Sequence, residues 1–255
     1  MLAPLRWART ALTSTALRAW FVKRLFRRRD EGGDIYPDDA SRGIVAGPAF
    51  DRILVLGEGT AVGLGVSVSD LAMGAQLARE LSHGTRKGVH WSSIALDRFR
   101  LDSAPALIRD TPSIATVDLV IVIAGITDTL RLTSLRAWEL AVTDTLAALE
   151  SLLSRDAVIV FAEIPPMDNA GSISRIARVT SGRRAAAFNA ATRRLVLGRD
   201  GAISVAFPAS LRNEVWLPGS RESSYATMYA LWANAVVLAI LDERGRAHRV
   251  GNFPA

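Results

Sequence analysis

The sequence predicts an α/β domain in which a parallel sheet is covered by helices on both faces. Two observations indicate this fold class. Short apolar runs alternate along the chain with longer segments of helical periodicity, which is the pattern of repeated β-α-β units. The runs that follow Asp118 and Arg155 are apolar almost throughout, as is typical of strands that are buried on both faces.

Strands and helices are expected in alternation from residue 52 onward. The expected strands lie at 52–57, 89–96, 118–124, 157–162 and 203–207, and the expected helices at 69–82, 138–153, 183–197 and 225–241. Each helical segment is long enough to connect two parallel strands. We therefore expect the strands to form one sheet. The chain contains no internal repeat.

Composition limits the domain count and the class of partner. A chain of 255 residues with 49% hydrophobic residues suits one well-buried domain with some chain to spare. Residues 1–29 contain eight basic residues and no acid, so the net charge of +6 leaves −2 for the residues from 30 on. A basic domain surface for nucleic acid is therefore not indicated. The chain has no cysteine, which excludes disulfides, thiolate metal sites and a cysteine nucleophile.

The first 47 residues differ in character from the rest. Residues 1–26 mix apolar side chains with arginines and are too interrupted to span a bilayer. They either contact an anionic membrane surface or form a docked helix or a frayed end. Residues 30–47, rich in Asp, Gly and Pro, predict a linker. The expected division is a segment 1–47, a domain 48–243 and a tail 244–255, in the cytoplasm or at the membrane periphery.

A glycine-rich turn follows the first strand. The strand ends at Gly57, and Gly59, Gly63 and Gly65 come before the next helix. Ligands of open parallel sheets bind at the carboxyl ends of the strands. A ligand of this protein is therefore expected over Glu58, Gly59 and Thr60.

Three short blocks resemble those of a known family. They are 57–63 (Gly-Glu-Gly-Thr-Ala-Val-Gly), 125–128 (Gly-Ile-Thr-Asp) and 229–233 (Tyr-Ala-Leu-Trp-Ala). Together they resemble the SGNH (GDSL-type) hydrolases, in particular the small actinobacterial-type esterases, over about residues 50–241. The resemblance implies a flavodoxin-like three-layer α/β/α sandwich with a five-stranded parallel sheet, and hydrolysis of esters.

The positions at which that family carries its catalytic groups hold other residues here. The serine nucleophile aligns with Gly59 and the oxyanion asparagine with Thr127. Counting back from the last helix, the aspartate aligns with Ser220 and the histidine with Ser223, while the glycine of the second block aligns with Arg98. Ester hydrolysis by this route needs a nucleophile, a base and oxyanion donors. The resemblance therefore predicts a pseudo-hydrolase.

Other side chains near these positions are candidates for ligand binding. Glu58, Asp128 and Glu222 are carboxylates near the predicted cleft and are expected mainly to hold loops together. Thr60 is an alternative nucleophile, one residue beyond the family's serine position.

Two arginines suggest what a rebuilt cleft would bind. Arg98 and Arg221 would convert an ester site into an anion site if both reached the cleft. The alternative is that both arginines are solvated surface residues without a ligand.

The leading hypothesis is a catalytically degenerate protein with a binding or scaffolding role, at a membrane surface through residues 1–29. One alternative is an active ester hydrolase or acyltransferase with a rebuilt site. A second is a nucleotide-binding protein, because Gly57-x-Gly59-x-x-x-Gly63 is a loose dinucleotide fingerprint. The expected partners are a protein or a small anionic ligand, and neither a cofactor nor a metal is expected.

Overall fold

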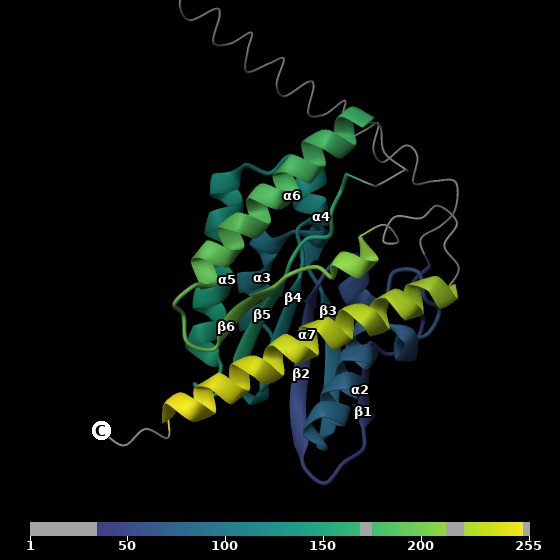
Figure 1. Cartoon of the computed structure of the whole chain (residues 1–255), viewed down its shortest axis with the longest axis vertical. Helices are drawn as coiled ribbons and strands as arrows, with labels where there is room; N and C mark the ends of the chain where they lie inside the picture. Colours follow the sequence, from purple (N-terminus) through teal and green to yellow (C-terminus); the bar gives the residue numbers. More distant parts are fainter. Residues whose placement is uncertain (1–34, 169–174, 213–221, 252–255) are drawn as a thin grey trace, which may run out of the picture.

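The computed structural model describes residues 35–168, 175–212 and 222–251, which form a sheet between two layers of helices (Figure 1). The sheet has six strands in the order β1-β3-β2-β4-β5-β6. The strands are β1 (Arg42–Val45), β2 (Phe50–Gly57), β3 (Gly88–Ala95), β4 (Leu119–Ile123), β5 (Val158–Ala162) and β6 (Ala202–Val205). The five strands from β2 on are parallel, in the strand order of flavodoxin-like proteins. The predicted three-layer architecture is confirmed.

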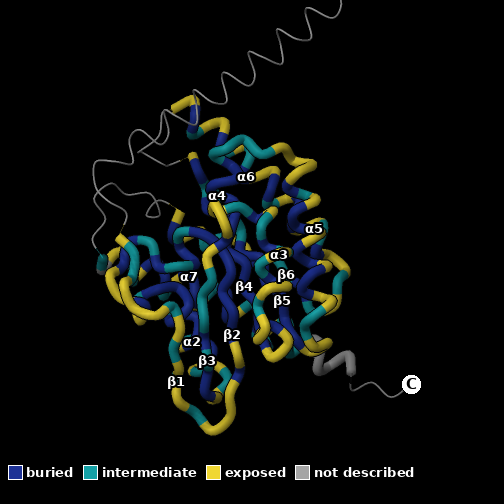
Figure 2. Tube along the Cα trace, turned by 180° about the vertical axis from the view of Figure 1, so that it is seen from behind, coloured by how far each residue is buried: buried dark blue, intermediate teal, exposed yellow. Residues whose placement is uncertain are grey.

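The helices divide between the two faces of the sheet. They are α2 (Met73–Thr85), α3 (Ala104–Arg109), α4 (Ile126–Leu130), α5 (Leu135–Leu152), α6 (Arg175–Val196) and α7 (Glu222–Gly251). Helices α2 and α7 share one apolar core with the sheet, and α3, α5 and α6 share the other. Alternate residues of β2 serve the two cores, because Ile53 lies in the first and Leu54 in the second. Figure 2 shows the buried central strands between exposed loops.

The sequence-based prediction was wrong about part of the linker and about the strand count. Residues 42–45 form β1, which pairs antiparallel with the edge of β3, so that Val45 lies opposite Val89. The preceding residues also contact the domain, since Ile35 accepts a backbone hydrogen bond from Gly65 at 2.7 Å. The sheet therefore has one antiparallel strand beyond the five expected.

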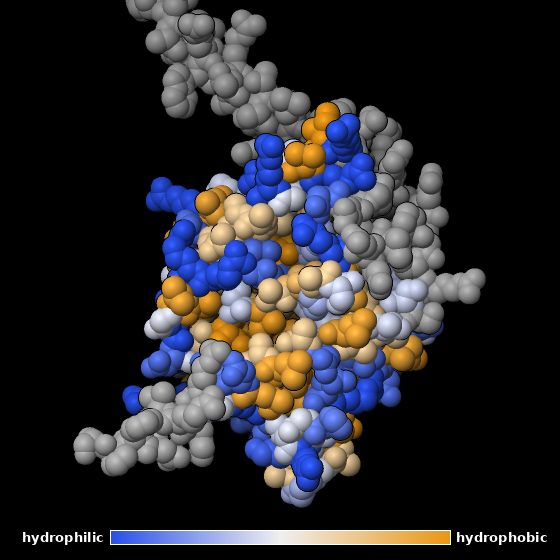
Figure 3. All heavy atoms as spheres, viewed as in Figure 1, coloured by the Kyte–Doolittle hydropathy of each residue, from blue (hydrophilic) through white to orange (hydrophobic). Residues whose placement is uncertain are grey.

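Helices α6 and α7 are longer than their apolar periodicity suggested. Helix α6 begins at Arg175 instead of residue 183, and α7 continues to Gly251 instead of ending near residue 241. The segment Ser224–Gly245 of α7 has the length and hydropathy of a membrane span. In this fold its Tyr229, Trp232 and Val236 are buried in the core, as in the core helix of a globular domain. Its outer face carries the exposed Leu231 and Leu238, and apolar surface runs along it in Figure 3.

Candidate functional site

The glycine turn lies where the strand order of the sheet reverses. From β2 the chain continues to β3, which lies on one side of β2, and then crosses to β4 on the other side. Such a switch point is the usual ligand position in open α/β sheets. Gly57 packs tightly there, because a Cβ atom on it would lie 2.0 Å from the Ile123 carbonyl oxygen. The next amide, Glu58 N, donates to that same oxygen at 3.0 Å. Gly59 follows with φ +50°.

The carboxylate of Glu58 fills the switch point. It is buried, and Oε1 accepts hydrogen bonds from the backbone amides of Gly125 at 2.7 Å and Thr127 at 3.1 Å. The Thr127 hydroxyl also donates to Oε2. Burial raises the pKa of Glu58, against the opposing effect of the hydrogen bonds from Thr127 and Gly125, and the charge of Asp128 raises it further. Glu58 thus joins the first and third sequence blocks through neutral donors.

Asp128 joins the third block to the second. Its carboxylate accepts hydrogen bonds from the Leu101 amide at 3.1 Å and from the Thr133 hydroxyl at 2.8 Å. Arg100 Nε lies 3.8 Å from the same carboxylate. These contacts fix the segment that follows β3 against α4, so Asp128 has a structural partner on each side.

Arg98 combines a left-handed backbone conformation with an exposed side chain. Its φ and ψ are 50° and 20°, in the left-handed region that favours glycine. The alignment by resemblance placed a glycine of the family at this position. The Arg98 side chain is 79% exposed and lies 3.7 Å from the carboxylate of Asp97.

Thr60 and the remaining glycines of the turn pack against other parts of the chain. Thr60 is buried, and its side chain interacts with the hydroxyl of Tyr229, whose pKa is raised by burial. A Cβ atom on Gly65 would lie 2.4 Å from the ring of Tyr225. A Cβ atom on Gly63 would lie 2.7 Å from Pro37. Close packing within the protein therefore accounts for Gly63, the last glycine of the dinucleotide-like pattern, and for Gly65, which lies beyond the pattern.

The beginning of α7 lies beside the same turn. Glu222 accepts hydrogen bonds from the Ser67 amide at 2.7 Å and the Ser67 hydroxyl at 2.5 Å, and these bonds lower its pKa. Ser223 follows in the first turn of α7, with its side chain outside the described part of the structure. Ser220 and Arg221 also lie outside the described residues.

The described histidine side chains lie away from the switch point. His83 is in the last turn of α2. His90 is in the first half of β3, where its ring contacts Phe50 with centroids 4.6 Å apart at the amino end of β2. Among the residues that the structure describes, no group of His, Asp and Glu side chains is arranged to hold a metal ion.

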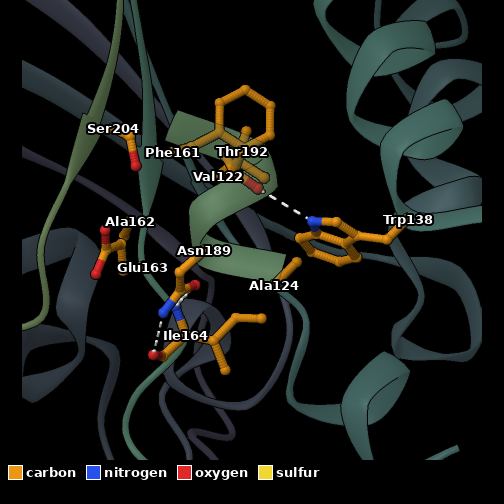
Figure 4. A pocket seen from close by; sticks show the side chains of 10 residues that line it. All are labelled: Val122, Ala124, Trp138, Phe161, Ala162, Glu163, Ile164, Asn189, Thr192 and Ser204. Atoms are coloured by element: carbon orange, nitrogen blue, oxygen red, sulfur yellow. Dashed lines mark hydrogen bonds between the residues drawn. The ribbon is translucent and has the colours of Figure 1, made fainter. Parts of the chain in front are cut away.

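In the described part of the chain, the space beside Glu58 is small and a larger space lies next to it. The cavity that Glu58 lines measures about 10 Å³, about enough for one water molecule. A second small cavity lies under Ile164, whose backbone is held by Asn189 through hydrogen bonds of 2.9 and 3.0 Å (Figure 4). A much larger cavity, of about 550 Å³, lies at the carboxyl ends of β5 and β6. The sequence-based prediction missed this cavity, although small residues such as Gly182 and Ala186 at helical spacing were a signal for it.

Comparisons with known proteins identify the fold. No family model and no curated protein matches the chain. Several solved structures match. The lipase Lip_vut3 from a goat rumen metagenome has a TM-score of 0.56 at 10% identity, over 74% of this chain and 96% of its own. An extracellular lipase from Streptomyces rimosus has a TM-score of 0.53 at 15% identity, over 74% and 98%. Axe2, an acetylxylan esterase from Geobacillus stearothermophilus, has a TM-score of 0.52 at 13% identity, over 79% and 96%. The protein therefore has the fold of the SGNH (GDSL-type) hydrolases.

Proposed function

We propose that this protein is a catalytically degenerate form of the hydrolase fold, with a binding or scaffolding role. The observation that carries the proposal is the contact between Glu58 and Thr127. The hydroxyl and the amide of Thr127 both donate to the carboxylate of Glu58. The donors at the aligned oxyanion position are therefore engaged by an acceptor within the protein, whereas an oxyanion hole needs donors aimed at the substrate.

Among the residues that the structure describes, no nucleophile or base was found near this position. Gly59 has no side chain to act as nucleophile, and Thr60 is buried beside Tyr229. His83 and His90 belong to α2 and to the first half of β3. Loss of a single triad member costs a hydrolase about 10⁴–10⁶ in rate, so combined loss supports the absence of measurable turnover.

Short p-nitrophenyl esters test this proposal directly. We expect the purified protein to hydrolyse them no faster than buffer, and a fluorophosphonate probe to leave it unlabelled. Saturable turnover that disappears in Thr60→Ala would favour the alternative, an ester hydrolase or acyltransferase with a rebuilt site. The likeness of the fold to lipases and esterases is the observation that keeps this alternative open.

The packing of the glycine turn argues against the nucleotide-binding alternative. The glycines at 57, 59 and 63 suggested it, but close packing against the Ile123 carbonyl and against Pro37 accounts for Gly57 and Gly63. A shift of the melting temperature on addition of dinucleotides would restore this alternative, and we expect none.

The proposed location of the binding role is an anionic membrane surface. Residues 1–29 carry +8, and each basic residue near such a surface contributes about 1 kcal/mol. The described part of the chain adds a basic, apolar patch at the beginning of α6, where Ile176 is 78% exposed beside Arg175. We expect the full-length protein to co-sediment with phosphatidylserine vesicles at low salt and to be released at high salt. A chain that begins at residue 35, which retains β1, is expected to bind the vesicles far more weakly. Equal binding by both chains would show that residues 1–34 do not contribute to membrane binding.

A further inference from the structure

The cavity of about 550 Å³ has the size of a small-molecule site. Its apolar lining residues include Ile164 and Met167 after β5 and Phe207 after β6. Met167 is fully buried. The cavity shares the lining residues Glu163 and Ile164 with the small space beside Glu58, and it extends from there along the carboxyl ends of β5 and β6 toward α6.

Helix α6 leaves this space open because of its sequence. The residues that face the cavity recur every three or four positions, and they include Val179, Gly182, Arg183 and Ala186. Two of the four are small, so the helix surface is indented there. Gly182 approaches Asp168 without crowding, since a Cβ atom on it would lie 3.5 Å from the Asp168 amide nitrogen.

The charges around the cavity favour an anion. Both carboxylates that line it have arginine partners, because Asp168 lies 3.4 Å from Arg212 and Glu163 pairs with Arg193. Arg183 also lines the cavity, and its side chain has no acidic partner among the residues that the structure describes. Among the described residues, Arg183 is therefore a positive charge without an acidic partner, and apolar side chains line the cavity with it.

We propose that this cavity binds a small organic anion with an apolar body, a carboxylate or a phosphate monoester, and that Arg183 contacts the anionic group. The guanidinium group presents paired donors that match either anion. Ile164, Met167 and Phe207 contact the apolar body. The proposal goes beyond the absence of turnover at the switch point, and it does not depend on it.

Binding of 4-phenylbutyrate and of phenyl phosphate to the full-length protein, measured by calorimetry, tests the proposal. The neutral 4-phenylbutanamide serves as the matched uncharged probe. We expect one or both anions to bind in a one-to-one complex, with the amide at least about tenfold weaker, which is about 1.4 kcal/mol. The relative affinity of the two anions distinguishes a carboxylate ligand from a phosphate. Absence of binding by both anions, or equal binding of phenylbutyrate and the amide, would overturn the proposal.

Two pairs of variants locate the site. Arg183→Ala is expected to lower anion affinity about tenfold, whereas Arg194→Ala, which removes an exposed arginine of the same helix outside the cavity, is expected to leave it unchanged. Ala186→Trp is expected to abolish binding by filling the cavity, whereas Ala187→Trp is the control, because Ala187 is also exposed and does not line the cavity. Equal effects within either pair would show that binding occurs elsewhere.

Discussion

The two ends of β2 each hold a buried carboxylate, and the two differ in their partners. At the amino end, Asp51 lies 3.2 Å from Lys87 Nζ and 2.7 Å from an Arg244 guanidinium nitrogen. At the carboxyl end, Glu58 accepts hydrogen bonds only from neutral donors among the described residues, those of Gly125 and Thr127. Burial acts to raise both pKa values, but the cations outweigh it at Asp51, so its pKa is lowered while that of Glu58 is raised.

The carboxylate at the amino end of β2 forms ion pairs between elements, whereas the carboxylate at the carboxyl end lies at the candidate site. The ion pairs of Asp51 connect β2 to the end of α7 and to the turn before β3, far from the switch point. A carboxyl group with a raised pKa at a switch point is a candidate catalytic acid. Here, however, its oxygens are occupied by Gly125 and Thr127. The raised pKa of Glu58 thus draws attention to the candidate site, and its hydrogen bonds show that the carboxylate connects β2 to the residues that follow β4.

Among variants of these two carboxylates, Asp51→Asn is expected to have the largest effect on the free energy of unfolding. The substitution removes the charge that Lys87 and Arg244 pair with, and hydrogen bonds to charged groups contribute about 2 kcal/mol to stability. We expect a loss of about that size in the free energy of unfolding at pH 7. Because the folded-state pKa of Asp51 is lowered, this contribution is present above the unfolded value of 3.8 and is lost as the pH falls through the folded-state value.

Urea unfolding at pH 7 and at pH 3 checks this expectation. The wild-type and Asp51→Asn proteins should converge toward the lower pH. The exposed pair of Asp70 with Arg79 provides the control, since Asp70→Asn should cost less than about 1 kcal/mol. A cost for Asp51→Asn no greater than for Asp70→Asn would mean that the amino-end ion pairs contribute nothing to stability.

Glu58 is expected to have a smaller effect on the free energy of unfolding, with a pH dependence opposite in sign to that of Asp51. Its pKa is raised in the folded state, so the folded protein binds a proton more tightly than the unfolded chain. Stability should therefore fall as the pH rises above the unfolded value of about 4.5, until the folded-state pKa is passed. The slope is at most about 1.4 kcal/mol per pH unit for one proton. Glu58→Gln, which keeps an acceptor for Gly125, should lose this slope.

The measurement is the free energy of unfolding at half-unit steps between pH 4 and pH 8. Glu150→Gln serves as the control, because Glu150 forms a surface pair with Arg199 and its removal should leave the slope intact. Parallel profiles for the wild-type and Glu58→Gln proteins would show that Glu58 is ionised in the folded protein throughout this range.

The sequence predicted the principal strands and helices because their signals are local. The apolar runs of β4 and β5 identify buried strands by themselves. In contrast, β1 has four residues, and its burial comes from pairing with β3, almost fifty residues later in the chain. The first turns of α6 were missed because Arg175 and Arg178 interrupt its apolar pattern.

The candidate site was predictable in its position but not in its contents. The glycine pattern identified the turn after β2. The contact between Glu58 and Thr127 joins residues 69 positions apart, and no local pattern records such a pair. The large cavity depends on how α6 packs against the ends of β5 and β6, so the small residues Gly182 and Ala186 gain their meaning only in the fold.

The smallest expected effect on stability comes from Gly59→Ser, which places a serine at the position where the resemblance puts the nucleophile of the SGNH hydrolases. A Cβ atom on Gly59 would lie 3.6 Å from Leu64 Cδ2, an ordinary contact, so the cost should come from the left-handed backbone alone, at about 1 kcal/mol. Gly198→Ser is the matched control, because Gly198 has φ +78° and no heavy atom within 4 Å of such a Cβ. We expect both variants to lose similar stability in urea unfolding and both to stay unlabelled by a fluorophosphonate probe, since an added hydroxyl without a base is not activated. Labelling of Gly59→Ser, but not of Gly198→Ser, would reveal a base at the carboxyl end of β2 and favour an active hydrolase with a rebuilt site.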